Sequence, residues 1–314
     1  AILTKAICVG ANLRGADLSD ANLSGADLSR ADLTGANLKG AKLNNANFTE
    51  AILEDADISL ANLTKSNLSG VAGSRANFSG ANLAGAQLTG AKLNSAVLGG
   101  AILSEADLTD AEMREANLNL ANLRGATLTQ AIITGANLRD AIMGRVSLSG
   151  ADLSGSDLSR ANLSIANLSR AHLNRANLEE AGLSGADLRA AQLRGAILRG
   201  AILRGAILGD SDLRRADLTK ATLRWANLSN ANLTGADLTE VDLTDAEVSP
   251  QTLAKARSVS KVDRPDTSHF ESAPVVVPPG QSGPLPMPRT PSYRRPSDRP
   301  DGKPKQPTEE TTGK

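Results

Sequence analysis

The sequence predicts an all-β fold for residues 1–248, a quadrilateral solenoid built from an unbroken array of five-residue repeats. Counted in pentads from Ala1, the frame holds without an insertion to Val248, with alanine at 44 of 50 first positions and leucine at 41 of 50 third positions. Aromatic residues make up only 2% of the chain, which predicts a thin aliphatic core. All 13 prolines lie at or beyond residue 250, as expected if every earlier backbone N–H is needed in a hydrogen-bonded ladder.

A period of five predicts one turn of the chain per repeat, because it matches neither the 3.6 residues of a helix nor the 2.0 of a flat strand. Four such corners close a square coil, and coils stack at a spacing of about 4.8 Å. The array therefore predicts about twelve coils in which residues 20 apart lie above one another. First and third positions point inward, and the third-position replacements are mostly apolar, as core positions require: Cys8, Phe48, Ile58, Phe78, Met113, Ile133 and Met143.

The sequence predicts that the array ends before Ser249. This residue is a favourable helix N-cap, and the proline that follows it suits the first helical position. We expect residues 249–258 to form a short helix that covers the C-terminal edge of the solenoid, since an open edge invites aggregation. Residues 259–314 contain twelve prolines and few aliphatic residues, which predicts a disordered, Pro-rich tail. A solvated linker or tail is favoured there over a segment that docks in an aromatic groove of a partner.

Charge and composition exclude several classes of partner. Lys plus Arg equal Asp plus Glu at 34 each, so no global attraction to nucleic acid or to an anionic membrane is expected. The chain lacks a run of about 18 apolar residues, and we expect a soluble, cytoplasmic protein. Because it begins in repeat register without Met, we expect a trimmed protein or a fragment whose upstream part, with any targeting signal, is missing.

Pentads such as Ala16–Asp20, Ala151–Gly155 and Ala236–Glu240 resemble the A-[DN]-L-x-x signature of pentapeptide-repeat proteins. The resemblance implies a right-handed quadrilateral β-helix with the third residue at its centre, and a short helix after the last coil. Most members of this family have no assigned biochemical activity. A minority, the fluoroquinolone-resistance members, mimic DNA and bind gyrase, and they are strongly acidic. This sequence departs from that subgroup, because residues 1–258 hold 25 Lys or Arg against 27 Asp or Glu and no loop interrupts the frame.

The sequence predicts no catalytic, cofactor-binding or metal-binding residues. His172 falls at an outward second position and His269 in the tail, so the array offers a single imidazole. Cys8 is expected to pack inward, where a thiol is inert. The repeated Asp residues lack the Gly-rich nonapeptide spacing of calcium-binding rolls, and we expect them to hydrogen-bond to the turns.

One stretch departs from the polar coat of the array. Between Ala186 and Asp210, second positions become Ile197, Ile202 and Ile207, while fourth positions become arginine, which predicts a belt of arginines around one coil. Trp225, the single tryptophan, should follow one coil later, and these residue types are enriched in interfaces. The alternative is an incidental run on a repetitive surface. The predicted partner-binding patch comprises Ile197, Arg199, Ile202, Arg204, Arg224 and Trp225.

We therefore expect a non-enzymatic scaffold for protein–protein interaction, with a protein of unknown identity as its partner. The alternative is a DNA mimic or nucleic-acid-related modulator of a topoisomerase, of the gyrase-binding type. An enzyme would require a domain outside this sequence. A homodimer joined through one end of the solenoid is a further expectation.

Overall fold

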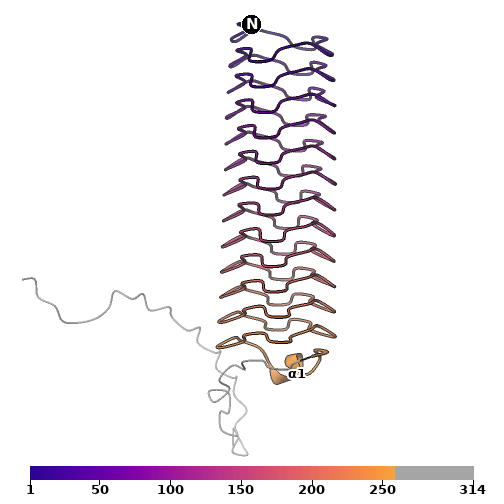
Figure 1. Ribbon diagram of the computed structural model, residues 1–314, viewed down its shortest axis with the longest axis vertical. Helices are drawn as coiled ribbons and strands as arrows, with labels where there is room; N and C mark the ends of the chain where they lie inside the picture. The colour runs from indigo at the N-terminus through magenta and orange to yellow at the C-terminus, as the bar shows by residue number, and fades with distance from the viewer. Residues whose placement is uncertain (259–314) are drawn as a thin grey trace, which may run out of the picture. The chain divides into compact units, whose positions relative to one another are not determined.

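The computed structural model describes residues 1–258 as a stack of coils, with Ala1 in the first coil and helix α1 (Pro250–Leu253) at the opposite end (Figure 1). Residues 259–314, for which a disordered tail is predicted, lie outside the described residues, and that prediction stays open. Within residues 1–258, α1 is the one helix, and no segment there is helical and apolar over a length that could cross a membrane.

Four pentads make one coil. Parallel β-bridges join each second-position residue to its counterpart four pentads later, as in Ile2↔Asn22 and Asn22↔Lys42, and each strand is reduced to this one bridging residue. We number the four faces of the solenoid in chain order: Ile2 lies on face 1, Ile7 on face 2, Asn12 on face 3 and Asp17 on face 4, and each face recurs once per coil. The predicted stacking of every fourth pentad is therefore observed.

Each pentad satisfies its backbone donors in a fixed pattern. In the pentad that begins at Ala21, Leu23 N–H donates to Lys42 O of the next coil at 2.8 Å, and Asn22 N–H donates to Ala1 O of the previous coil at 2.9 Å. Ala26 N–H closes the turn onto Leu23 O at 2.9 Å. This repeated use of backbone donors explains why proline is excluded from the array.

The fourth-position N–H is satisfied by a side chain. Every Asn or Asp at a second position accepts a hydrogen bond from the fourth-position N–H of its own pentad, at 2.8 to 3.2 Å. Asn162, for example, accepts from Ser164 N at 3.0 Å and from the Ser164 hydroxyl at 2.7 Å. These local bonds confirm that the repeated Asn and Asp residues stabilise turns.

Every fifth position from Lys5 to Asp245 has a left-handed backbone, and most of these positions are not glycine. A positive φ at the third residue of a turn is the geometry of a type II turn, which favours glycine or asparagine. The β-branched Ile165 nevertheless has φ 60° there, because the ladder on both sides fixes the turn. Side chains at fifth positions point outward at the corners; Leu60 and Ile165, for example, are exposed.

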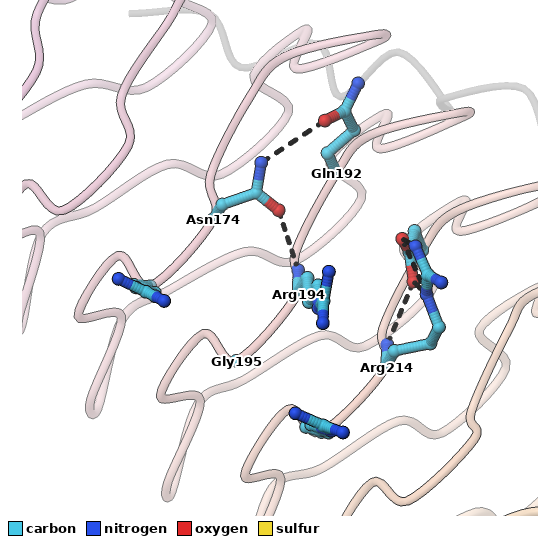
Figure 2. Close-up of a pocket in the computed structure, with 8 residues that line it drawn as sticks. Asn174, Gln192, Arg194, Gly195 and Arg214 are labelled. Carbon is cyan, nitrogen blue, oxygen red and sulfur yellow. Dashed lines mark hydrogen bonds and ion pairs between the residues drawn. The ribbon is translucent and has the colours of Figure 1, made fainter.

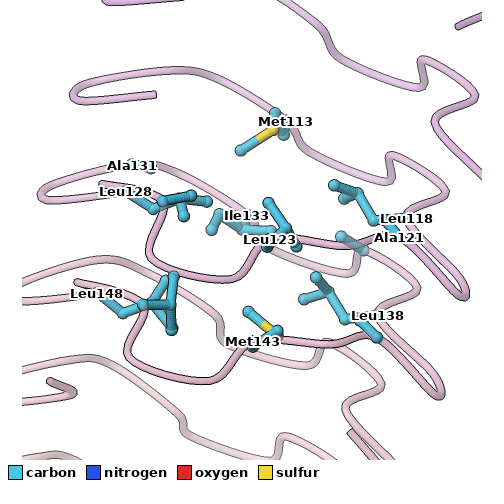
Figure 3. Close-up of a cluster of buried hydrophobic side chains, with 14 of the residues drawn as sticks. Met113, Leu118, Ala121, Leu123, Leu128, Ala131, Ile133, Leu138, Met143 and Leu148 are labelled. Carbon is cyan, nitrogen blue, oxygen red and sulfur yellow. The ribbon is translucent and has the colours of Figure 1, made fainter. Parts of the chain in front are cut away.

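First and third positions form a continuous buried column, as predicted. Apart from the two terminal coils, these side chains are at most 1% exposed, and the predicted replacements Phe48, Ile58, Phe78, Met113, Ile133 and Met143 all lie in this column. Leu and Met side chains of neighbouring coils point toward the same axis (Figure 3). Cys8 is half-buried, because the first coil has a neighbour on one side only among the described residues. At Gly73 the missing side chain is replaced by the side chain of Leu93, whose Cδ2 lies 3.0 Å from where a Cβ would stand.

The C-terminal helix is shorter than the predicted 249–258. Ser249 is its N-cap, with a side chain that accepts from Thr252 N at 3.1 Å, and Pro250 opens the helix. After Ala254 the chain returns to the ladder, where Leu238 N–H donates to Ser258 O at 2.9 Å. The pairing available to residues 255–258 thus competes with continuation of the helix and ends it after one turn.

Candidate partner-binding surface

The predicted patch residues lie at outward positions on two adjoining faces. Ile197 and Arg199 belong to face 4, whereas Ile202, Arg204, Arg224 and Trp225 belong to face 1. Ile197 and Ile202 are 38% and 48% exposed, and Trp225 is 46% exposed although it is the largest side chain in the array. Exposed apolar side chains also occur elsewhere on the array, as at Leu60 and Ile165, so what distinguishes this patch is the set of contacts around Trp225.

Trp225 is the centre of a small cluster. The guanidinium carbon of Arg204 lies 4.3 Å from the centroid of the indole ring, and that of Arg224 lies 5.2 Å from it. The indole N–H donates to Asp245 Oδ2 at 2.9 Å, and Arg224 Nε lies 3.8 Å from Asp242 Oδ2. Two cation–π contacts and one hydrogen bond hold the ring in a defined orientation, which lowers the entropy that binding would cost.

The predicted belt of arginines is not electrostatically uniform. Arg189 pairs with Asp187, and Arg199 Nε lies 2.6 Å from Asp217 Oδ2. That carboxylate raises the pKa of Arg199 through a hydrogen bond and its charge. Arg194, by contrast, forms no ion pair with any residue of the described array. The belt therefore alternates between neutralised and free cations.

The isoleucines remove turn hydrogen bonds that most other pentads possess. Ile197, Ile202 and Ile207 stand where Asn or Asp would accept from the fourth-position N–H. Within residues 1–258, the Arg199 and Arg204 N–H groups consequently have no acceptor. The apolar surface here is thus gained at a small loss of local stability.

Imidazole and carboxyl groups are spread over the described surface. His172 is exposed, and no three His, Cys, Asp or Glu side chains within residues 1–258 are grouped as a metal site would require. Hydrogen bonds from arginine lower the pKa of Asp140, Asp187 and Asp212. Burial acts to raise the pKa of Asp217, but hydrogen bonds from Thr219 and Arg199 outweigh it and the pKa is lowered.

Sequence reasoning missed a second arginine cluster on face 3. A hollow of about 460 Å³ is lined there by Asn174, Arg175, Gln192, Arg194, Gly195, Asp212, Arg214 and Arg215. The signal was present, because Arg175, Gly195 and Arg215 share the fifth position of every fourth pentad. It becomes visible only when the sequence is written as coils and not as pentads.

The family of the chain follows from its repeats and from its likeness to solved structures. The family model for pentapeptide repeats matches in eight copies that together cover residues 1–245 (1–35, 31–70, 56–94, 74–110, 91–130, 131–170, 166–205 and 206–245). The chain belongs to the pentapeptide-repeat proteins, which fold as right-handed β-helices. No curated protein matches the chain.

Three solved structures illustrate the relationship. HetL, a pentapeptide repeat protein involved in heterocyst differentiation regulation from the cyanobacterium Nostoc sp. strain PCC 7120, is 34% identical, with a TM-score of 0.50 over 74% of this chain and 90% of HetL. Rfr23 from the cyanobacterium Cyanothece 51142 is 34% identical over 33% of this chain and 64% of its own, with a TM-score of 0.27. QnrB1, a plasmid-mediated fluoroquinolone resistance protein, is 23% identical over 70% of this chain and 88% of its own, with a TM-score of 0.25.

Proposed function

We propose that this protein is a non-enzymatic scaffold that binds a protein partner through the patch centred on Trp225. The observation that supports this proposal is the indole ring held by Arg204 and Arg224 while 46% of the side chain stays exposed. Preorganised Trp and Arg side chains are the residue types enriched among energetic hot spots. The likeness to HetL, which is described as involved in regulation, is consistent with a role exerted through contacts and not through chemistry.

The alternative, a DNA mimic that binds a topoisomerase, receives less support. A DNA mimic needs a strongly acidic surface, whereas residues 170–225 contain ten Lys or Arg against six Asp or Glu. Likeness to QnrB1 is too distant to argue for a shared partner. Binding to DNA or to a topoisomerase with a steep dependence on salt would favour this alternative.

We also propose that residues 249–258 cap the solenoid after about twelve coils of four pentads. Leu253 and Ala256 pack against the buried column, and Ser258 pairs with Asp237 in the last ladder step. The cap covers backbone groups and apolar side chains that the last coil would otherwise expose. Cytoplasmic location and dimerisation through a solenoid end stay predictions.

The test of the scaffold is affinity capture with the full chain as bait, followed by quantitative comparison of variants. We expect the double variant Arg204→Ala, Trp225→Ala to weaken the binding free energy of a true partner by about 2 kcal/mol or more, because both residues are hot-spot candidates. The matched control is Arg124→Ala, Ile165→Ala, which removes residues at the same fourth and fifth positions of face 1, several coils away. Equal loss in both double variants, or loss in neither, would contradict the proposed patch.

A second variant separates binding from folding. Ile202→Asn should restore the turn hydrogen bond to Arg204 N–H and thereby stabilise the solenoid by about 0.5–1 kcal/mol. The same substitution removes apolar contact area from the patch. We expect a higher melting temperature together with weaker partner binding, a combination that damage to the fold cannot produce.

A further inference from the structure

We propose that the face 3 hollow is a binding site for a dianionic oxyanion of the phosphate type. This inference is independent of the proposed scaffold function, because Arg175, Arg194 and Arg215 lie on face 3, outside the Trp225 patch. Three kinds of observation carry it: unpaired guanidiniums, a gap between them, and an ion pair elsewhere on the same face that shows what fills such a gap.

The hollow carries excess positive charge. Four arginines line it, against the single carboxylate of Asp212, which leaves three positive charges in excess (four minus one). Arg214 uses that carboxylate fully, with Nε 2.8 Å from Oδ1 and Nη2 2.6 Å from Oδ2. The other three guanidiniums have no acidic partner among residues 1–258. Such a cluster is self-repulsive until an anion joins it.

Gly195 creates the gap. It lies at a fifth position between Arg175 and Arg215, one coil from each, so the backbones of these two arginines are about 10 Å apart along the solenoid. The Arg175 side chain leans toward this gap, since its Cγ lies 3.8 Å from where a Gly195 Cβ would stand, and an oxyanion in the gap can accept hydrogen bonds of about 2.8 Å from guanidiniums on both sides. Arg194 precedes the glycine and projects from the middle coil (Figure 2).

Neighbouring amides fix the wall of the hollow. Asn174 Oδ1 accepts from Arg194 N at 3.1 Å, and its Nδ2 donates to Gln192 Oε1 at 3.2 Å (Figure 2). Because the Gln192 oxygen is occupied, its own NH₂ group remains as a further neutral donor. The Gln192 NH₂ group and the three unpaired guanidiniums give the hollow an excess of donors, which suits an anion and disfavours a cation.

Asp55 and Arg75 show what the same positions do when an acid is present. Both occupy fifth positions of face 3 in successive coils, and Arg75 donates to Asp55 through two bonds of 2.8 and 2.7 Å. Arg160 and Asp140 repeat the arrangement on face 4. Gly195 stands where the acid would precede Arg215, so the carboxylate is missing and an external anion can take its place.

Gly195→Asp is therefore the decisive variant. A Cβ at Gly195 would lie 3.8 Å from Arg175 Cγ, an ordinary contact, and Asp already occupies the same left-handed position at Asp55. We expect this variant to fold, to pair with Arg215 and to melt at or above the wild-type temperature. Its internal carboxylate should weaken binding of phosphate about tenfold or more.

The measurement is thermal melting of the full chain with inorganic phosphate, with O-phosphoserine, or with chloride at matched ionic strength. Wild type should gain stability with phosphate beyond the chloride effect, since a ligand that binds the folded state raises its melting temperature. Gly195→Asp and the double variant Arg175→Gln, Arg215→Gln should lose that gain. A larger gain with O-phosphoserine indicates a phosphorylated side chain as the source, and an equal gain indicates the free anion; both support the site.

Gly10→Asp is the matched control, because it places an acid one coil before Arg30 at the fifth position of face 2, in a space with no atom within 4 Å. It should keep the full response to phosphate. If wild type responds to phosphate no more than to chloride, or if Gly195→Asp responds as wild type does, the site does not exist. Neither result bears on the Trp225 patch, so the two proposals fail separately.

Discussion

Replacing Leu158 by aspartate tests the assignment of third positions to the core. Leu158 is fully buried, and its N–H donates to Asn177 O at 2.7 Å, so the backbone gives the new side chain no freedom to turn outward. An ionised carboxylate in this aliphatic column has no partner, and the group must become protonated to remain inside.

The cost has two parts. Loss of the leucine from a packed column costs about 3 kcal/mol. Protonation of a carboxyl with an ordinary pKa of about 3.9 costs about 4 kcal/mol at pH 7, at 1.36 kcal/mol per pH unit. Their sum, about 7 kcal/mol, is comparable to the whole stability of an ordinary domain. We expect the variant to lose its ordered circular dichroism signal or to unfold at much lower urea.

The pH dependence identifies the cause. A carboxyl whose folded-state pKa is raised destabilises the fold more as pH rises above its unfolded pKa, so the difference from wild type should shrink by about 1.4 kcal/mol per unit between pH 7 and pH 5. Asn162→Asp is the control, because it places the same side chain at an outward position of the same coil. An unchanged urea midpoint for Leu158→Asp, or a penalty that does not vary with pH, would refute the inward assignment.

Three further outcomes are expected. Truncation after Ser258 should leave the melting temperature unchanged within error, since the Pro-rich segment has no periodic apolar positions; a drop of many degrees would show that it packs on the solenoid. Asn162→Ala should cost about 1 kcal/mol in urea unfolding, because the Ser164 N–H loses its acceptor, and no cost would show that water replaces the bond fully. Twelve carboxyl groups within residues 1–258 have a pKa below the ordinary value, chiefly through hydrogen bonds, so this part of the folded chain binds fewer protons near pH 4 than it does when unfolded. Stability should therefore hold above about pH 5 and fall as pH drops below about 4; a urea midpoint unchanged at pH 3 would contradict this.

The fold could be predicted from the sequence because each pentad repeats the same physical constraint. The inward positions, the apolar replacements such as Phe48 and Met143, and the turn-forming role of Asn and Asp all follow from one period. The extent of the C-terminal helix could not be predicted, because it depends on pairing between residues 255–258 and the coil that contains Asp237. Pairing of this kind is set by tertiary structure and has no local signal.

The sites were less predictable, because side chains on the surface acquire their partners from neighbouring coils. The sequence places Arg199 and Arg204 in one belt, yet Arg199 is neutralised by Asp217 of the next coil, while Arg204 contacts Trp225. The left-handed backbone at Ile165 had no signal either, since a β-branched residue disfavours that conformation. Contacts between coils decide both features.

Because the ladder and the buried column fix the fold, the outward positions are free to vary, and we expect function where their usual residues are replaced. At second positions the usual Asn or Asp stabilises a turn, so the isoleucine at Ile202 gives up a hydrogen bond for exposed apolar area. At fifth positions of face 3, Arg75 has Asp55 one coil before it, whereas Arg215 has Gly195. The isoleucine costs the isolated chain a turn hydrogen bond, whereas Gly195 fits its left-handed backbone but leaves Arg215 without an acidic neighbour. A bound partner would cover the exposed Ile202 side chain, and a bound anion would neutralise Arg215. These two needs are the physical reason to look for ligands at the two sites.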